Sequence, residues 1–547
     1  MPQTIRHMVS GRIGIALLVF AAFLLAGVAT LNDYGVTLDE VPNFLVGERH
    51  ARFWLELHPE RLTFRDERPL DPDELGRGMY AWYTKTADAM RPGQHHGFAD
   101  LDFPFPWAYP PLANTLSGAS CIVFFHWLGW LPPIEAHHLA IVVFAALGGA
   151  LVYAWTARRF GAAAGLLGAF FLCAYPRFFA DAHNNVKDLP ETVLFAAAMF
   201  ALVSATERRT VARLAVFGIV WGLALAIKPN AAFLPLAASP WVLLAWRESR
   251  PSTRAIAALL ATPVLALGTV ALLWPYLWVG HPIDHVSSFL EYYRLLGTFG
   301  PPRFQWLPAV YAVAVTPLPL ILWAIVGASS LVRRRDPMAV LLLAWLVVPI
   351  LRVSVPRAYS YDGIRHYMEF LPALGILGGI GLARAARSVA SASRGGRTAA
   401  VALVLTAIVP IAWANVRLHP YQTVYFGGAV GGFRGAVRLA LPSAFDYWGT
   451  SLREGVEWLG EHAEPHATVV VPFAVHVARY DVPRGDLRIA HRRWLPPDFD
   501  GWVLRLVRND RHGWKPVLKQ LRRYRPVHVI SADGVPLLEI YRVRRAD

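Results

Sequence analysis

Two acidic segments hold the side chains best suited to take a proton from a nucleophile. Asp39 and Glu40 are adjacent and follow the first apolar run, and Asp188 opens a later one. A carboxylate beside a membrane surface can accept a proton from a hydroxyl group, which makes all three candidate catalytic residues. The same spacings suit helix capping, with Asp39 as N-cap, Thr37 and Glu40 as a capping box, or Asp188 in a first turn. On spacing alone, capping is the stronger interpretation for the first pair.

Cationic residues accompany these acids. Lys187 precedes Asp188, Lys228 lies between two apolar runs, and the loop 357–367 is basic. Cations at helix N-termini suit a phosphate group, whereas an interfacial anchor explains the same arginine and tyrosine residues about equally well. The candidate substrate contacts are His183, Lys187, Lys228, Arg365 and Tyr367.

The sequence predicts no metal site and no cofactor, although it leaves a divalent metal open. The two cysteines, Cys121 and Cys173, lie inside apolar runs, which argues against a disulfide framework and against a thiolate zinc site. The histidines at 95–96 and 137–138 are adjacent pairs and lack the spacing of a metal site.

The composition indicates that the protein lies in a membrane. Of 547 residues, 55% are hydrophobic and 17% are charged, more apolar surface than a water-soluble fold can bury. The apolar residues form runs, and about 20 residues of helix cross a hydrocarbon core. The formal charge of +15 comes largely from arginines in short loops. The sequence shows no basic face with stacking aromatic residues, so we expect no nucleic-acid partner.

The arginine clusters set the topology. If every apolar run crossed the membrane, the clusters would lie outside, against the positive-inside rule. The run 112–131 is the weakest span because it contains several polar residues and follows a segment rich in proline and aromatic residues, so we expect an interfacial or re-entrant helix there. About eleven spans then remain in a multi-pass inner (plasma) membrane protein with a cytoplasmic N-terminus. The predicted spans are 13–31, 139–156, 162–179, 189–205, 214–227, 231–246, 256–278, 306–332, 338–353, 367–383 and 398–414.

Two domains follow from this pattern. Residues 1–415 form an all-α membrane module with a large first outer loop at 32–137, and residues 416–547 form a small extracytoplasmic α/β domain. Strands are expected near 468–471, 527–530 and 537–541, where β-branched residues alternate or cluster. A helix is expected to begin at the capping-box spacing of Ser451 and Glu454.

The order of short motifs resembles one known family. The motifs are Asp39-Glu40, Pro110-Pro111-Leu112, Arg158-Arg159-Phe160-Gly161, Lys187-Asp188-Leu189-Pro190 and Arg365-His366-Tyr367, followed by tail segments at 419–426, 431–436 and 446–449. Together they resemble the GT-C glycosyltransferases of the protein-mannosyltransferase and aminoarabinose-transferase type, glycosyltransferase family 39 in the broad sense. Each motif is short, and their order carries the resemblance.

The resemblance implies inverting transfer of a sugar from a polyprenyl-phosphate donor to an acceptor hydroxyl or amine on a lipid, glycan or protein outside the cytoplasm. Asp39 matches the family's candidate general base, Asp188 its second acid, and Arg365 a phosphate contact. The helix at 112–131 would line the route of the polyprenyl tail from the bilayer. The sugar and the acceptor stay open.

Two other classes of function compete with this interpretation. A secondary transporter would need charged residues within spans and related halves, whereas the acids here cluster at predicted helix ends and no inverted hydropathy repeat is evident. A non-catalytic membrane assembly protein would use the acidic pairs only as helix caps.

Overall fold

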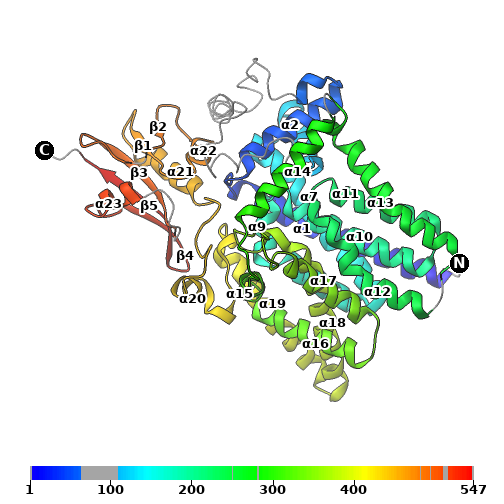
Figure 1. Ribbon diagram of the computed structural model, residues 1–547. Helices are drawn as coiled ribbons and strands as arrows, with labels where there is room; N and C mark the ends of the chain where they lie inside the picture. The colour runs from blue at the N-terminus through cyan, green and yellow to red at the C-terminus, as the bar shows by residue number, and fades with distance from the viewer. Residues whose placement is uncertain are drawn as a thin grey trace.

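The computed structural model describes residues 3–62, 109–248, 251–279, 282–480, 482–492, 494–508 and 515–544. Figure 1 shows a bundle of long helices with a small sheet at one end, while the N-terminus lies at the other end of the bundle. We call the end that carries the sheet the domain end. The greater part of the predicted first outer loop, 63–108 with the histidines at 95–96, lies outside the described residues.

Six helices are long and apolar enough to cross a membrane, and two bent helix pairs raise the number to eight. The long spans are Gly11–Asp33, Pro133–Phe160, Asp188–Arg208, Thr253–Leu273, Arg365–Ala392 and Gly396–Leu418. The bent pairs are α8 (Ala162–Cys173) with α9 (Pro176–Asn184) and α15 (Leu307–Ala314) with α16 (Leu318–Arg333). The shorter helices between them are α11 (Val211–Leu225), α12 (Leu234–Glu248) and α17 (Met338–Arg352). Each of the eleven predicted spans is therefore helical, and the predicted polytopic fold class is confirmed.

The long helices differ in what surrounds them. The apolar windows of α1 (Gln3–Ala29) and α13 (Thr253–Leu273) are only 11% and 17% buried, whereas those of α10 (Asp188–Arg208) and the span ending in α18 (Leu371–Ala392) are 83% and 89% buried. Apolar side chains on the first two helices thus face the surroundings, as expected for helices in lipid. The inner helices form the core that positions the site.

The remaining helices of the membrane module lie near the domain end or connect the spans. α2 (Glu40–Glu56) packs against α6 (Leu112–Cys121), which continues as the π-helix η3 (Ile122–Trp127). The predicted helix at 112–131 thus exists in part, and among the described residues it is not one of the helices long enough to cross. α7 (Pro133–Phe160) and α19 (Gly396–Leu418) are two of the long spans given above. The other elements are α14 (Pro282–Phe299) and the 3-10 segments η1 (Leu31–Asp33), η2 (Pro59–Leu62), η4 (Pro229–Phe233), η5 (Pro275–Leu277) and η6 (Arg365–Phe370).

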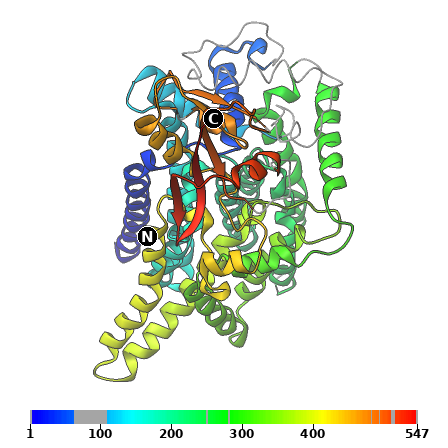
Figure 2. The same ribbon diagram turned by 90° about the vertical axis from the view of Figure 1, so that its left-hand side faces the viewer.

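A five-stranded mixed sheet forms the C-terminal domain. Its order is β2-β1-β3-β5-β4, in which β1 runs parallel to β2 and β3, and β5 runs antiparallel to β3 and β4. The predicted strands appear as β1 (Thr468–Val470), β4 (His528–Ala532) and β5 (Val535–Val543), while β2 (Arg488–Ala490) and β3 (Gly501–Leu506) were missed. Figure 2 looks onto this sheet in front of the helix ends.

Helices cover both faces of this sheet. α21 (Leu452–His462) packs on one face beside Leu504 and Leu538, and α23 (Lys515–Leu521) packs on the other against Val503 and Tyr541. The short helices η7 (Gln422–Val424), η8 (Gly428–Val430), α20 (Gly432–Arg438) and α22 (Val475–Tyr480) complete the domain. The alternation of side chains along the strands supplies both apolar faces.

Glycines let the inner helices approach closely. A Cβ atom added at Gly381 of α18 would collide with the backbone oxygen of Trp323 on α16, and one added at Gly327 of α16 would collide with the oxygen of Leu377. Small residues commonly permit such close helix crossings in membranes. The α16–α18 contact therefore depends on the absence of side chains at both positions.

We expect Gly381→Ala to lower the midpoint of thermal unfolding in detergent, because the new methyl group forces the two backbones apart at a cost of about 1–3 kcal/mol. Gly268→Ala on α13 is the matched control, since a Cβ atom there meets no atom within 4 Å. It should be neutral or stabilising by up to about 1 kcal/mol through helix propensity. Equal melting of the two variants would contradict the packing argument.

Candidate active site

The candidate residues meet at the domain end, where several helices begin. Asp39 precedes α2, Asp188 is the first residue of α10, Lys228 precedes η4, and Arg365 is the first residue of η6. Lys187 lies within electrostatic range of all four of these side chains. The two acidic segments, about 150 residues apart in the sequence, thus lie close together in the fold.

Arg365 is the centre of this cluster. Its guanidinium pairs with the Asp39 carboxylate through Nη1 and with Asp362 through Nη2, which lies 3.0 Å from Oδ2. The guanidinium also lies over the rings of Tyr361 and Trp448, at 4.7 and 5.3 Å from their centroids. The residue is buried, and its Nε has no hydrogen-bond partner within the described chain. Two carboxylates and two rings therefore fix its position.

Asp362 was not predicted as part of the site. It lies in the loop before η6, where burial raises the pKa of its carboxyl group to about 6 in spite of the neighbouring Arg365 guanidinium. Nearby Asp39 adds to this increase. Asp362 is thus a second carboxylate that competes with Asp39 for one guanidinium.

Lys228 and Lys187 provide two further cations. Lys228 forms a buried ion pair with Asp188. The Lys187 ammonium lies 4.1 Å from the centroid of the Tyr109 ring. Burial lowers the pKa of Lys187 to about 8, against the opposing effect of the Asp39 and Asp188 carboxylates. Within the described residues, Lys187 is the cation of this cluster with no carboxylate in ion-pair contact.

The structure argues against a capping role for two of the acids. Neither α2 nor α10 has a side-chain hydrogen bond from its N-cap residue, and the amide of Asp188 instead donates to Oδ1 of Asn185 at 2.9 Å. The side chain of Asp188 is 4% exposed and that of Asp39 is 26% exposed. Asp39 is therefore the more accessible of these two carboxylates.

Glu40, the third predicted catalytic acid, contacts Thr37 and His138. Its Oε2 accepts a hydrogen bond from the amide of Thr37 at 2.7 Å, and its Oε1 lies 2.8 Å from Nε2 of His138 on α7. Half of the predicted capping box thus forms, whereas the Thr37 hydroxyl has no hydrogen-bond partner within the described chain. Burial raises the pKa of the Glu40 carboxyl group well above its usual range, in spite of the hydrogen bond from the Thr37 amide.

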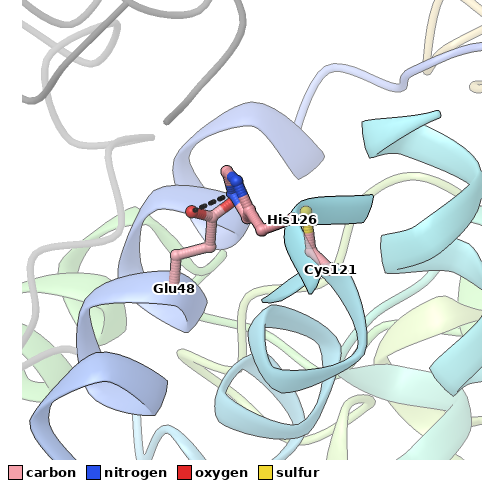
Figure 3. Close-up of side chains that lie close together, drawn as sticks. All are labelled: Glu48, Cys121 and His126. Atoms are coloured by element: carbon pink, nitrogen blue, oxygen red, sulfur yellow. Dashed lines mark ion pairs between the residues drawn. The ribbon is translucent and has the colours of Figure 1, made fainter. Parts of the chain in front are cut away.

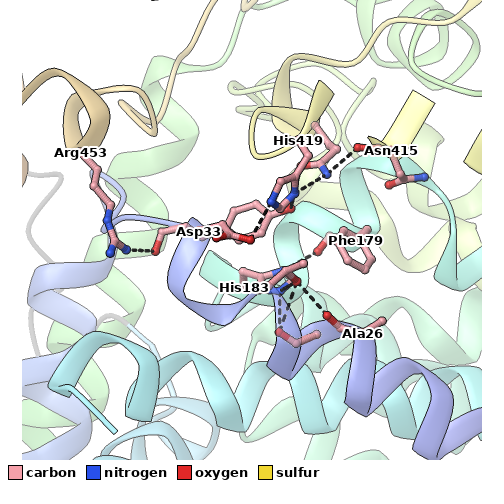
Figure 4. A network of polar contacts seen from close by, with 11 residues as sticks. Ala26, Asp33, Phe179, His183, Asn415, His419 and Arg453 are labelled. Atoms are coloured by element: carbon pink, nitrogen blue, oxygen red, sulfur yellow. Dashed lines mark hydrogen bonds and ion pairs between the residues drawn. The ribbon is translucent and has the colours of Figure 1, made fainter. Parts of the chain in front are cut away.

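His183, a predicted substrate contact, makes contacts that join helices (Figure 4). Its Nδ1 donates to the carbonyl oxygen of Phe179 at 2.9 Å, and its Nε2 lies 3.0 Å from Oγ1 of Thr30. The imidazole ring stacks on Tyr34 with 4.0 Å between centroids. Both ring nitrogens are thereby engaged in joining α1 and its following turn to α9.

Tyr367 is likewise part of the packing. Its ring is fully buried, and its hydroxyl donates to the carbonyl oxygen of Pro308 at 3.0 Å. This bond ties η6, and with it Arg365, to the start of α15. Tyr367 thus supports the position of Arg365, and its contact with a substrate stays a prediction.

The C-terminal domain contributes the loop at 446–449, a segment of the motif series to which the sequence assigned no role. The Asp446 carboxylate accepts hydrogen bonds from the amides of Gly449, Thr450 and Ser451 and from the hydroxyl groups of the last two, at 2.7–3.1 Å. Because the Ser451 hydroxyl is committed to Asp446, the predicted capping box with Glu454 is wrong, although α21 does begin at this point.

This loop directly contacts the segment that leads to Asp39. The amide of Leu38 donates to the carbonyl oxygen of Trp448 at 3.0 Å, and the carbonyl oxygen of Leu38 lies 3.1 Å from Nε2 of His476. Both backbone groups next to Asp39 are therefore paired with the C-terminal domain. The Trp448 ring also lies against Arg365, so one loop fixes both members of the Asp39–Arg365 pair.

Arg177 was also missed and supports the other side of the loop. Its Nε donates to the carbonyl oxygen of Tyr425 at 3.1 Å, and Nη1 lies 3.4 Å from the Tyr447 hydroxyl. Gly363 packs so closely that a Cβ atom there would lie 2.5 Å from Arg177 Nη1, and its φ of +73° favours glycine. An arginine near the end of the predicted span 162–179 was the signal available in the sequence.

We expect Asp446→Asn to destabilise the protein by about 1–3 kcal/mol, because an amide oxygen cannot replace both carboxylate oxygens that now accept hydrogen bonds. Thermal unfolding in detergent measures the effect. Asp498→Asn is the control, since this exposed aspartate lies in the same domain. If both variants melted with the parent protein, the loop would not depend on the Asp446 carboxylate.

Comparisons with known proteins extend this description. Residues 133–274 match the family model of dolichyl-phosphate-mannose-protein mannosyltransferases. No curated protein sequence matches the chain. Similar solved structures include ArnT from Cupriavidus metallidurans bound to undecaprenyl phosphate, with 14% identity, 98% of each chain covered and a TM-score of 0.47. They also include the Archaeoglobus fulgidus oligosaccharyltransferase tethered to an acceptor peptide, with 12% identity, 90% and 69% coverage and a TM-score of 0.45. The family match over residues 133–274 agrees with the resemblance to GT-C glycosyltransferases predicted from the order of the motifs.

Proposed function

We propose that the protein transfers a sugar, with inversion at the anomeric carbon, from a polyprenyl-phosphate donor to an acceptor hydroxyl or amine. The observation that carries this proposal is the partly exposed Asp39 carboxylate beside Arg365, Lys187 and Lys228 at one end of a membrane bundle. A base and several cations at the bilayer surface suit a phosphate-activated donor whose lipid tail remains in the membrane.

The cations stabilise the negative charge that develops on the phosphate leaving group. As the bond between the anomeric carbon and the phosphate oxygen breaks, a phosphodiester with one negative charge becomes a phosphomonoester with up to two. Positive groups fixed nearby stabilise this change. Lys187 is the best placed of them for a phosphate contact, since Lys228 and Arg365 each already contact a carboxylate.

Asp39 acts as the general base in this proposal. The acceptor oxygen or nitrogen forms a bond to the anomeric carbon while its proton passes to the Asp39 carboxylate. Arg365 orients that carboxylate, and its unpaired Nε adds one donor toward the phosphate. Asp188 holds Lys228 in place and so acts as a positioning residue.

The domain end is assigned to the non-cytoplasmic side of the inner (plasma) membrane. α10 begins at the site with Asp188 and ends at Arg208, and α18 begins after Arg365 and leads to the arginines at 384–397. The arginine-rich ends thus lie away from the domain end, and the positive-inside rule makes that side cytoplasmic.

We expect the purified protein to transfer labelled hexose from a polyprenyl phosphate to a component of a membrane extract. Asp39→Asn should reduce turnover roughly 10²- to 10⁴-fold, since an amide cannot accept the proton. Asp33→Asn is the control because Asp33 lies close in sequence and pairs with His419 outside the cluster. A folded Asp39→Asn protein that transfers sugar at the parental rate would remove Asp39 as the base.

The pH dependence tests Lys187 as the phosphate contact. Lys187 carries its charge below a pKa of about 8 and loses it above, so kcat/KM for the donor should fall as pH rises through about 8. Lys187→Arg keeps its charge and should abolish this alkaline limb. Lys519→Arg, at an exposed lysine of the C-terminal domain, should retain it. An unchanged limb in Lys187→Arg would contradict the assignment.

A further inference from the structure

Three different metal-binding side chains converge where α2 crosses α6. Glu48 comes from α2, Cys121 is the last residue of α6, and His126 belongs to the π-helix η3 (Figure 3). One ligand atom from each lies within 4.8 Å of the others. The site is separate from the Asp39–Arg365 cluster described above.

The irregular helix brings two of these ligands together. In an α-helix with 3.6 residues per turn, residues five apart point about 140° away from each other. The π-helix closes its turns with bonds between residues five apart, one of which joins the amide of Leu128 to the oxygen of Val123 at 3.0 Å. Cys121 and His126 therefore face the same side of the helix.

The third ligand comes from a close helix crossing. A Cβ atom on Gly47 would collide with the backbone of Asn114, and one on Gly118 would collide with the backbone of Gly47. Asn114 also donates to Oδ1 of Asn43 at 3.2 Å. This contact holds α2 against α6 and places Glu48, the next residue after Gly47, beside the cysteine.

The distances suit a shared ion better than a direct bond. Oε2 of Glu48 and Nε2 of His126 are 3.7 Å apart, too far for a hydrogen bond. Ligand bonds of about 2.0–2.2 Å at a tetrahedral angle separate two ligand atoms by about 3.4 Å. Nε2 of His126 is shielded from solvent, has no hydrogen-bond partner within the described chain and faces the Glu48 carboxylate only at ion-pair distance, which leaves room for an ion between the two atoms.

A neighbouring histidine orients the carboxylate. Oε1 of Glu48 lies 3.2 Å from Nε2 of His137, whose Nδ1 lies 3.0 Å from the Ser117 hydroxyl. Outer-sphere partners of this kind fix metal-binding carboxylates and leave the second oxygen for the ion.

We propose that Glu48, Cys121 and His126 bind a divalent transition-metal ion of the zinc class. Thiolate, imidazole and carboxylate are the ligand types of Zn²⁺, and a water molecule would take the fourth position. The ion acts as a clip between α2 and α6, and thereby secures the helix that follows Asp39. The sequence predicted no metal site. The spacing of Cys121 and His126 is unusual for two ligands on a regular helix, and Glu48 lies far from both in the sequence.

The test is metal binding by the full chain, purified without a histidine tag. The parent protein should contain about one zinc per chain by elemental analysis, and Co²⁺ should give the charge-transfer absorption of a cobalt–thiolate bond. Cys121→Ser should lose that absorption and most of the zinc. Cys173→Ser is the matched control, since Cys173 packs in an apolar helix against α7 and should retain both signals.

A stability measurement keeps the proposal testable if one variant folds poorly. Zinc should raise the thermal unfolding midpoint of the metal-free parent and of Cys173→Ser, but not that of Cys121→Ser or His126→Gln. A parent protein that binds neither Zn²⁺ nor Co²⁺ would overturn the proposal. Equal metal content and equal cobalt spectra in Cys121→Ser and Cys173→Ser would also overturn it. None of these readouts depends on sugar transfer.

Discussion

The buried guanidinium of Arg365 is the group on which the site depends. A charge removed from water is tolerated only where opposite charges and hydrogen bonds surround it. Asp39 and Asp362 provide the opposite charges, and the Trp448 ring covers the guanidinium. These partners come from three distant parts of the chain, so the helices and the C-terminal domain must dock before the arginine is satisfied. The need to pair one cation thus specifies how several elements meet.

The C-terminal domain has a direct part in this arrangement. Asp446 organises the loop whose Trp448 carbonyl accepts the amide of Leu38, and His476 pairs with the carbonyl of the same residue. Asp39 is consequently held through the backbone of Leu38 by the C-terminal domain and through its carboxylate by the membrane module. The proposed base therefore has little freedom to reorganise, which favours electrostatic stabilisation of a reaction over flexible binding.

The helix that starts after Asp39 is secured along its length as well. Glu40 pairs with His138 at its first turn, Gly47 allows contact with α6 at its centre, and Glu48 belongs to the proposed metal site. Polar groups therefore join α2 to its neighbours where a water-soluble protein would rely on apolar burial. At a membrane interface the hydrophobic effect discriminates less between neighbours, and specific polar contacts fix the geometry.

The sequence by itself located the apolar helices of the bundle, because hydrophobic length and loop charge are local properties of the chain, but it did not predict α14. It also identified Asp39, Asp188, Lys187 and Arg365 as candidates, from the order of the motifs that contain them. Only the tertiary structure decided how these side chains are paired, because each partner lies on another element.

The same limit explains what the sequence could not decide. It did not separate Asp39 from Glu40, since adjacent carboxylates look alike until one is buried against His138. Nor did it reveal the Glu48–Cys121–His126 cluster, because a π-helical turn and a helix crossing create that proximity. Periodicity reports the face of a helix, whereas the pairing of polar groups depends on which faces meet after folding.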